Sequence, residues 1–388
     1  MARIALLTNY PRDSGIGRYS FTLFRELNKI IKNDNNADII DLYRFDRKIR
    51  GLYKIEGNDE VLIGTVNGLL PLNNSFFGKF RFSNLLNDFL IGSHIPQNYD
   101  LYHITNQNIS NMNYYKNIRS AVITVHDIHF ITCPSYLTQK LSGTLIYKGI
   151  KNCKFIISIS KSTKRDIIQY LKIPSDKIKV IYHGIDRTFR PLKESDLSYI
   201  YRELNLDNRY KYILHVGADT LRKNFATLLK AIRKLVDNYN LKNIKLIKIG
   251  KINNNTRNLI GSLNLEQYVK VVYFVPEEDL VKFYNLAEVF VFPSLQEGFG
   301  FPVLEAMACG CPVITSNTSS LPEVVGDAGI MIDPKDIKGF AGAIYNVLAD
   351  ESFRKELSKK GLKRAKKFTW EKCAKETLNV YREALNYD

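Results

Sequence analysis

The sequence predicts an α/β protein that consists of two doubly wound domains, each with a mostly parallel sheet. Short runs of β-branched residues alternate with helical stretches along the chain, which is the pattern of parallel strands connected by helices. The alternation stops in a polar, charged segment near the middle of the chain and then begins again. A length of 388 residues also exceeds that of a typical single domain. We therefore expect two hydrophobic cores, one on each sheet.

The first domain is predicted to span residues 1–186. Its strand candidates are the apolar runs at residues 4–7, 101–104, 121–125, 155–159 and 178–181. The first helix is expected to begin near Tyr19. Residues 40–98 contain scattered glycine, asparagine and phenylalanine without a clear period, and they are interpreted as irregular connections with one helix near residues 83–89.

The second domain is predicted to repeat this pattern over residues 208–367. Its strand candidates are residues 212–216, 244–249, 271–274, 289–292 and 312–315, and helices are expected at residues 226–239 and 278–286. Pro191 interrupts the polar stretch between the domains, and residues 187–207 are interpreted as the interdomain linker.

Composition argues against several classes of protein. The apolar fraction of 45% is ordinary for a globular chain, and no apolar run approaches the length of a membrane span. The chain passes directly from Arg3 into the strand candidate at residues 4–7, without the basic and apolar regions of a signal peptide, so a cytoplasmic protein is expected. The five cysteines form no CxxC pair and no zinc-ligand spacing, which favours reduced thiols.

The formal charge of +17 is concentrated in the first half of the chain. Residues 1–190 carry 27 Lys and Arg against 15 Asp and Glu, whereas residues 191–388 carry 29 against 24. No RGG tract, aromatic RNA-binding signature or zinc finger accompanies this charge, so nucleic acid is not an expected partner. Residues 139–190 either rest on an anionic membrane or form a solvated basic face. The apolar residues interleaved with the basic ones there are Leu141, Leu145, Ile146 and Tyr147.

Doubly wound sheets bind ligands beyond the carboxyl ends of their strands, so polar residues in those loops are candidates for a site. Gly15 and Gly17 lie between the first strand and its helix, where backbone amides and the helix amino end can approach a phosphate. An ordinary tight turn is the competing interpretation. The third glycine of a dinucleotide-binding GxGxxG would fall at Ser20, so that fingerprint is incomplete and a nicotinamide dehydrogenase is not favoured.

His126 and Asp127 directly follow the apolar strand at residues 121–125. A histidine at a strand end, beside a carboxylate, can polarise a substrate hydroxyl or bind a sugar through its backbone. The alternative is a histidine that is satisfied within the core. His129 adds a second imidazole, but two histidines without a third ligand make a poor metal site, and no metal is expected here.

Arg222, Lys223 and Asn224 stand between the strand at residues 212–216 and the helix expected from Ala226. Two cations beside a helix amino terminus suit a diphosphate, whose leaving charge grows as its bond to a sugar breaks. Basic residues at this position oppose the helix dipole, and an anion would relieve the mismatch. A solvated pair of charges is the alternative interpretation.

Residues 293–310, PSLQEGFGFPVLEAMACG, form the most specific stretch of the chain. They lead from a strand through a glycine-rich loop into a helix near Pro302, and the loop amides together with the helix end offer an anion site. Glu297 in the loop and Glu305 in the helix are eight positions apart, so both carboxylates can accept hydroxyl groups of one elongated ligand. A buried turn with two solvated acids is the competing interpretation.

Together these elements resemble a retaining glycosyltransferase of family 4, also called glycosyl transferases group 1, which has the GT-B fold. The resemblance rests on residues 293–312 with their E-x7-E spacing, on the Arg-Lys-Asn element, on the amino-terminal glycine loop and on the His-Asp strand end, all in the family's order. Residues 321–326 and 329–333 are similar to the end of the family's second domain. The likeness implies two Rossmann-like domains facing across a cleft, with residues 368–388 as a C-terminal helix that crosses back to the first domain.

The resemblance implies a role for each candidate residue. Glu297 would bind hydroxyls of the donor sugar, Glu305 the ribose, and Arg222 with Lys223 the diphosphate. His126 would lie near the reacting carbon and stabilise the sugar in the transition state. The implied catalytic set is therefore His126, Arg222, Lys223 and Glu297. Further residues are implied to line the donor site, and they are Gly15, Gly17, Gly298, Phe299, Gly300, Val303 and Leu304.

The implied reaction moves a hexose from a nucleotide-sugar to a glycan or lipid-linked acceptor, with retention of configuration. No DxD motif occurs in the chain, so no metal is expected. The resemblance implies no other cofactor, since the nucleotide-sugar is a substrate. Mannose from GDP-mannose is the first expectation for the donor and glucose from UDP-glucose the second, with the nucleotide base against the loop after residues 271–274. A GT-B epimerase or phosphorylase, and a binding protein without activity, are other functions compatible with this architecture. Membrane contact would place the protein at the inner face of the membrane.

Overall fold

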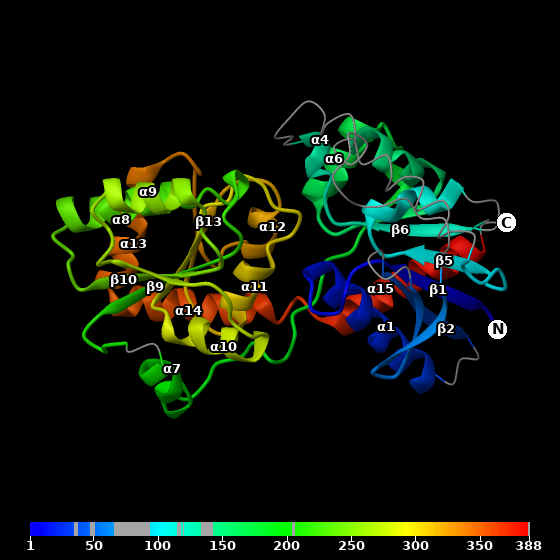
Figure 1. The fold of residues 1–388 in the computed structure, drawn as a ribbon, viewed down its shortest axis with the longest axis horizontal. Coiled ribbons are helices and arrows are strands. Elements are labelled where there is room, and N and C mark those ends of the chain that lie inside the picture. Colours follow the sequence, from blue (N-terminus) through cyan, green and yellow to red (C-terminus); the bar gives the residue numbers. More distant parts are fainter. Residues whose placement is uncertain are drawn as a thin grey trace. The chain divides into compact units, whose positions relative to one another are not determined.

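The computed structural model describes residues 1–34, 38–46, 51–65, 94–114, 118, 120–132, 143–203 and 206–386. Contacts within the chain divide it into two compact units (Figure 1). Unit 1 consists of Met1–Gly184 and Trp370–Asp388, and unit 2 consists of Ile185–Thr369. The chain therefore leaves unit 1 once and returns to it for its last helix.

Unit 1 is built on one mixed sheet. Its strands in the described residues are β1 (Arg3–Thr8), β2 (Ile39–Asp46), β3 (Gly51–Glu56), β4 (Asp59–Thr65), β5 (Leu101–Ile104), β6 (Ala121–Val125), β7 (Phe155–Ser158) and β8 (Ile178–Val180). They are ordered β4-β3-β2-β1-β5-β6-β7-β8. The neighbouring strands in the part of the sheet ordered β2-β1-β5-β6-β7-β8 are all parallel. At the other edge, β3 pairs antiparallel with both β2 and β4.

The strands predicted for the first domain are all present in unit 1, with ends shifted by at most one residue. The prediction of irregular connections in residues 40–98 is wrong for residues 40–46, 51–56 and 59–65, because these belong to β2, β3 and β4. The pattern of β4 is hard to recognise, since all of its residues except Gly64 are exposed and the alternation of a half-buried strand is missing. The helix expected near residues 83–89 lies outside the described residues.

Helices pack on the sheet of unit 1. They are α1 (Gly15–Asn33), α4 (His129–Thr132), α6 (Lys161–Leu171) and α15 (Trp370–Leu385), with the short 3-10 helices η1 (Gln107–Tyr114), η2 (Lys148–Asn152) and η3 (Ser175–Lys177). Helix α1 begins after Ser14, whose Oγ accepts the N–H of Gly17, and its buried stripe includes Leu23 and Leu27. Helix α15 packs beside α1 (Figure 1), so the last helix of the chain helps to form the core of unit 1.

A buried polar network fixes α15 to the sheet of unit 1. The Tyr381 hydroxyl lies 2.5 Å from His103 Nδ1, and His103 Nε2 lies 2.8 Å from Thr124 Oγ1. The Tyr19 hydroxyl of α1 lies 2.8 Å from the same threonine oxygen. All four side chains are buried, so their polar groups depend on one another in place of water. Burial lowers the pKa of His103 to about 3, and its ring is therefore neutral.

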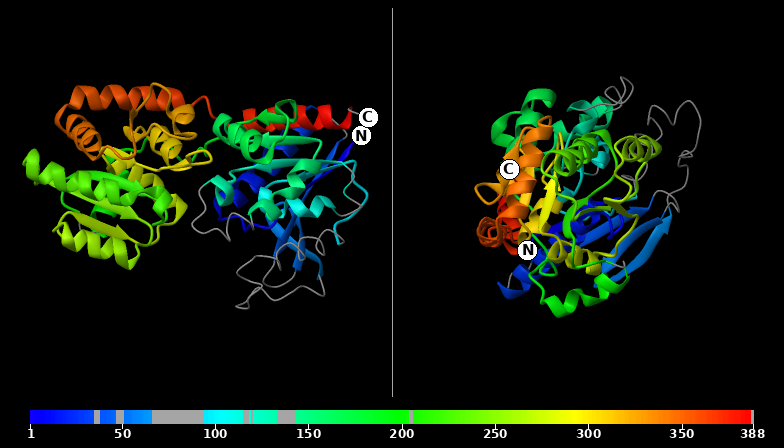
Figure 2. Two further views of the ribbon diagram at one scale, coloured as in Figure 1. Left: turned by 90° about the horizontal axis from the view of Figure 1, so that it is seen from above. Right: turned by 90° about the vertical axis from the view of Figure 1, so that its left-hand side faces the viewer.

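Unit 2 contains a parallel sheet. Its strands in the described residues are β9 (Lys211–Val216), β10 (Ile244–Ile249), β11 (Val269–Val272), β12 (Val289–Phe292), β13 (Val313–Ser316) and β14 (Ile330–Ile332). They are ordered β11-β10-β9-β12-β13-β14, and every pairing is parallel. The central strands β9 and β12 are largely apolar, as is typical of strands covered on both faces. Figure 2 shows helices on both sides of this sheet.

The core of unit 2 lies between β9, β10 and two long helices, α8 (Phe225–Asn238) and α13 (Ile337–Ala349). The remaining helices are α7 (Ser198–Glu203), α9 (Asn254–Ser262), α10 (Glu277–Leu286), α11 (Phe301–Ala308), α12 (Leu321–Val325) and α14 (Glu351–Ala365), with η4 (Glu194–Leu197) and η5 (Leu221–Lys223). Each unit therefore carries helices around a largely parallel sheet, and the α/β fold class with two Rossmann-like domains is confirmed.

Three details of unit 2 differ from the sequence-based prediction. Strand β14 is not among the predicted strands, because it is short and none of its residues is buried. Strand β11 ends at Val272, because its neighbour β10 ends at Ile249, and Tyr273 and Phe274 beyond it are 51% and 80% exposed. The polar stretch interpreted as a linker contains η4 and α7, which the pattern of apolar residues does not reveal because the segment is short and charged.

Candidate functional site

The loops that follow β9 and β12 meet at the carboxyl edge of the sheet in unit 2. The N–H of Leu295 donates to the carbonyl of Arg222 over 2.8 Å. The side-chain amide of Asn224 donates to the carbonyls of Pro293 and Pro334, at 3.0 and 2.8 Å. Asn224 has a left-handed conformation (φ 52°) immediately before α8, which turns the chain from the loop into the helix. The basic element and the E-x7-E segment are therefore side by side.

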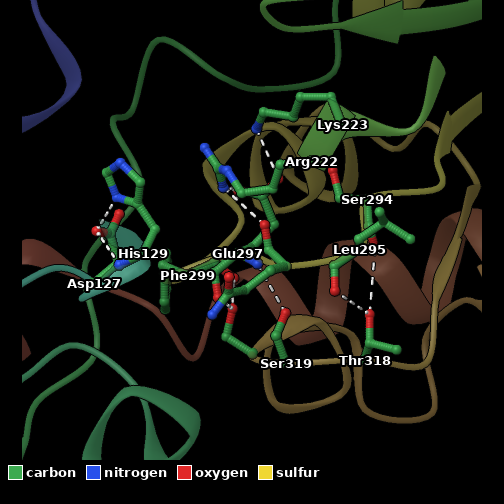
Figure 3. Close-up of polar contacts among 12 residues, drawn as sticks. Asp127, His129, Arg222, Lys223, Ser294, Leu295, Glu297, Phe299, Thr318 and Ser319 are labelled. Carbon is green, nitrogen blue, oxygen red and sulfur yellow. Dashed lines mark hydrogen bonds and ion pairs between the residues drawn. The ribbon is translucent and has the colours of Figure 1, made fainter. Parts of the chain in front are cut away.

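Glu297 is the centre of a charged cluster. Its Oε1 lies 2.7 Å from Lys223 Nζ, and its Oε2 lies 3.1 Å from Arg222 Nη1 (Figure 3). Arg222 Nη1 also donates to the carbonyl of Gln296 over 2.7 Å. The side chains of Glu297 and Lys223 are 8% and 12% exposed, so this ion pair is largely shielded from water. Two cations around one carboxylate leave a positive excess, which suits an anionic ligand.

Two serines hold the loop that carries Glu297. Ser319 Oγ accepts the N–H of Glu297 at 2.9 Å, and Ser320 Oγ donates to the carbonyls of Glu297 and Phe299 at 3.0 and 2.8 Å. Gly298 lies in the same loop, and the Phe299 ring is buried. Neither serine is a site candidate from the sequence, since a serine pair before a helix ordinarily marks a turn. Their position after β13, at the ligand-binding edge of a parallel sheet, is the signal that could have identified them.

Gly300 turns the chain into α11. Its φ is +113°, and a Cβ atom at this position would lie 2.9 Å from the Leu321 side chain. The carbonyl of Gly300 accepts the N–H groups of Val303 and Leu304, at 3.0 and 3.2 Å. The backbone amides of these two residues are therefore engaged inside the helix, and their side chains are fully buried in the packing of unit 2.

Glu305 projects from α11 into the interior of unit 2. It is only 2% exposed, and the Tyr284 hydroxyl of α10 donates to its Oε2 over 2.9 Å. Glutamate is almost never buried this deeply without polar partners. The tyrosine therefore fixes the orientation of the second carboxylate of the E-x7-E pair, and its importance is not visible in the sequence because it lies on another helix.

In unit 1, Gly15 and Gly17 form the first turn of α1. The N–H of Gly17 donates to Ser14 Oγ at 3.0 Å, and a Cβ at residue 17 would lie 1.8 Å from the carbonyl oxygen of Pro11. Gly17 is therefore required by the close approach of the preceding loop, which favours the tight-turn interpretation for this residue. At Gly15 a Cβ would meet no atom within 4 Å, so packing does not require a glycine there.

His126 is buried at the end of β6. Its Nε2 donates to the carbonyl of Thr105 at 2.9 Å, and its backbone N–H donates to Gln107 Oε1 at 3.0 Å. The imidazole lies edge-on to the Tyr19 ring and beside His183, with centroids 5.0 and 5.3 Å away. Burial lowers the pKa of His126 to about 4. The ring is therefore neutral at neutral pH, with Nδ1 as its acceptor, and it is suited to hydrogen bonding rather than to acid catalysis.

Asp127 and His129 pair with each other in the loop after β6. The Asp127 carboxylate accepts from His129 Nδ1 at 2.5 Å and from the His129 backbone N–H at 3.3 Å (Figure 3). Within the part of the chain that the structure describes, no three His, Cys, Asp or Glu side chains are grouped so as to hold a metal ion.

The basic segment at residues 139–190 has exposed lysine and arginine side chains in unit 1, but several of its apolar side chains are buried. Ile146 and Tyr147 are 5% and 0% exposed because they pack into the core, so these two residues cannot rest on a membrane in the way that the membrane alternative supposes. Leu145 is 46% exposed, and Leu141 lies outside the described residues. Of the helices in the described ranges, none has the length and apolar character needed to span a bilayer. The exposed basic residues are Lys148, Lys151, Lys161, Arg165 and Lys172.

Both units match known glycosyltransferases. Residues 200–364 match the family Glycosyl transferases group 1, and residues 14–189 match Glycosyltransferase Family 4. The chain is 33% identical over 270 residues to the O-antigen chain mannosyltransferase B of Escherichia coli, covering 68% of this chain and 71% of the relative. It is 30% identical over 234 residues to the O-antigen chain mannosyltransferase RfbU of Salmonella typhimurium, covering 59% and 61%.

The fold has a close counterpart among solved structures. The sucrose-phosphate synthase of Thermosynechococcus elongatus superposes with a TM-score of 0.80 at 21% identity, covering 100% of both chains. At 21% identity this structural likeness supports only the fold of the chain. The assignment to a family rests on the matches to the two family models and to the mannosyltransferases. The chain therefore belongs to glycosyltransferase family 4: it is a hexosyltransferase of the GT-B fold that takes its sugar from a nucleotide-sugar donor.

Proposed function

We propose that this enzyme transfers mannose from GDP-mannose to a glycan or lipid-linked acceptor, with retention of configuration and without a metal ion. The observation that carries the proposal is the cluster in which Arg222 and Lys223 bind Glu297 at the carboxyl edge of the unit 2 sheet. Two relatives at 30% and 33% identity are named mannosyltransferases, which supports mannose as the donor sugar.

The diphosphate of the donor is bound by Arg222 and Lys223. Both cations contact the carboxylate of Glu297, so an anionic diphosphate competes with this carboxylate for them. The exchange leaves the Glu297 oxygens to accept hydroxyl groups of the sugar. The same two cations then stabilise the charge that develops on the departing phosphate, which is the contribution that a metal ion makes in other transferases.

Glu305 and His126 complete the proposed set. Tyr284 donates to Glu305 Oε2 at 2.9 Å and fixes the plane of the carboxylate, which accepts the ribose hydroxyls because each carboxylate oxygen can take more than one hydrogen bond. His126 stabilises the sugar in the transition state as a neutral imidazole, since its Nε2 proton is directed at the Thr105 carbonyl.

The proposed reaction passes through an oxocarbenium-like transition state. As the bond between the sugar and the diphosphate breaks, its electron pair moves to the departing oxygen, which Arg222 and Lys223 stabilise. The acceptor hydroxyl attacks the face that the diphosphate leaves and passes its proton to the departing phosphate oxygen. No separate strong base is then required, and the configuration at the sugar carbon is retained.

Incubation of the purified protein with a panel of GDP- and UDP-sugars tests the proposal. Without acceptor we expect slow release of GDP from GDP-mannose, because water replaces the acceptor hydroxyl, and we expect EDTA to leave this rate unchanged. Selective release of UDP from UDP-glucose would instead identify glucose as the sugar. Once an acceptor is found, an inverted linkage by NMR would contradict the retaining mechanism.

A matched pair of lysine variants controls this experiment. Lys223→Ala should slow the release by about 10²-fold, because it removes a cation that stabilises the leaving charge. Lys230→Ala removes an exposed lysine of α8 and should leave the rate unchanged. If no nucleoside diphosphate is released from any donor of the panel and calorimetry detects no donor binding, the proposed function is contradicted.

We also propose that unit 1 meets an anionic membrane on the cytoplasmic side, mainly through its basic residues. The exposed basic residues support this contact, while Ile146 and Tyr147 are buried and do not take part in it. Co-sedimentation with phosphatidylglycerol vesicles should therefore occur at low salt and be lost near 1 M salt, where the screening length is only about 3 Å. A Lys161→Glu, Arg165→Glu variant should bind more weakly, and no binding of the wild type at low salt would exclude the contact.

A further inference from the structure

Lys248 is a buried lysine that the proposed chemistry leaves unexplained. It lies on β10, and none of its side chain reaches solvent (0% exposed). Its Nζ donates to the carbonyls of Gly217 and Ile249, the second at 3.0 Å, and lies 5.4 Å from the centre of the Phe225 ring. Lysine is almost never buried this deeply, because removing the ammonium from water is costly.

The carbonyl that Lys248 binds belongs to the turn that leads to the phosphate-binding element. Gly217 (φ +147°) follows β9, and Gly250 (φ +113°) follows β10. A Cβ at Gly250 would lie 2.4 Å from the Gly217 oxygen, and a Cβ at Gly217 would lie 3.6 Å from Lys223 Cε. The two turns are therefore in direct contact, and Lys248 binds the turn against which the Lys223 side chain lies.

The charges around Lys248 also point to the phosphate site. Burial lowers the pKa of Lys248 to about 8, with Asp219 opposing the shift and Lys223 adding to it. His215 is the register partner of Lys248 on β9, and both approach the Phe225 ring. Burial, together with the charges of Lys248 and Lys223, lowers the pKa of His215 to about 3. Lys248 is therefore the group of this cluster that titrates near pH 8.

We propose that Lys248 is a positioning residue for the donor diphosphate, which holds the Gly217 turn against Lys223 and adds a third positive charge to the phosphate site, besides those of Arg222 and Lys223. The inference rests on the proposed function, because it concerns the same phosphate site.

A diphosphate beside the two lysines favours the protonated form of Lys248 and so raises its pKa. Donor affinity is then highest below about pH 8, where Lys248 already carries its proton. Affinity falls as the pH rises further, because binding must then take up a proton.

Calorimetry with the nucleotide sugar that the wild type cleaves, GDP-mannose first, tests the inference from about pH 7 to about pH 9. Lys248→Met should bind about tenfold more weakly at pH 7, since a one-unit rise of the Lys248 pKa on binding corresponds to a tenfold affinity. The wild type should bind about fivefold more weakly at pH 9 than at pH 7. Lys248→Arg stays charged, so it should match the wild type at pH 7 and lack this pH dependence.

Lys245→Met is the matched control. Lys245 lies on the same strand, but its Nζ binds the carbonyl of Gln267, so its loss should change neither affinity nor pH dependence. Melting temperatures check the folding of every variant.

Three outcomes would overturn the inference. Equal affinities of wild type and Lys248→Met at pH 7 would do so, as would the same pH dependence in wild type and Lys248→Arg. If Lys248→Met does not fold, the inference is tested by comparing the pH dependence of donor affinity in Lys248→Arg with that in the wild type. A wild type that binds no nucleotide sugar would contradict the proposed function itself, and the inference would fall with it.

Discussion

Glu297→Gln should lower kcat by about 10²- to 10³-fold while strengthening the binding of GDP. Each carboxylate oxygen of Glu297 pairs with one cation, Lys223 at 2.7 Å and Arg222 at 3.1 Å. Glutamine has nearly the same shape but no charge, so it competes less well with phosphate for the two cations. It is also a weaker acceptor for sugar hydroxyls, so a contact that strengthens in the transition state is lost. Steady-state kinetics at saturating donor and calorimetry with GDP measure the two effects.

Glu356→Gln provides the control, because this glutamate is exposed on α14, so its replacement should change neither kcat nor the affinity for GDP. A kcat within about threefold of the wild type for Glu297→Gln would contradict a role in the transition state, where one lost contact costs far more. Loss of GDP binding in the same variant would show instead that Glu297 is needed to order Arg222 and Lys223.

The free energy of unfolding should fall steeply between about pH 7 and about pH 5. Burial lowers the pKa of His103 to about 3, that of His126 to about 4 and that of His215 to about 3. In the unfolded chain these rings take up protons near pH 6.5, whereas the native state does so only at much lower pH. Stability is therefore present at neutral pH and lost on acidification, by about 2 kcal/mol for each ring at pH 5. Urea denaturation at both pH values measures the loss.

His215→Phe tests the assignment within unit 2. The His215 ring packs against Phe225 and Phe292, with centroids 4.9 and 5.9 Å away, so a phenyl ring fits the same space without titrating. The loss of stability between the two pH values should shrink by about 2 kcal/mol. His129→Gln is the control, since the His129 side chain is 34% exposed. An unchanged loss in His215→Phe would rule out His215 as a source of acid sensitivity.

Periodicity predicted most of the parallel strands of both units, because strands covered on both faces are apolar runs that stand out in the sequence. It failed for β2, β3, β4 and β14, of which β4 is largely exposed and β14 has no buried residue, and for the end of β11, which depends on where β10 stops. Periodicity reports burial, and residues whose burial is set by a neighbouring strand or by solvent carry little signal of their own.

The sequence by itself determined the fold class, the division into two units and the loops that carry the candidate residues, since these follow from local patterns and from the ligand-binding edge of parallel sheets. Only the tertiary structure decided how those residues meet. It pairs Lys223 with Glu297 across 74 positions, holds the Glu297 loop with Ser319 and Ser320, and places Lys248 against the Gly217 turn. The physical reason is that β9 lies between β10 and β12 in the sheet, so loops far apart in the chain become neighbours only when the strands pair.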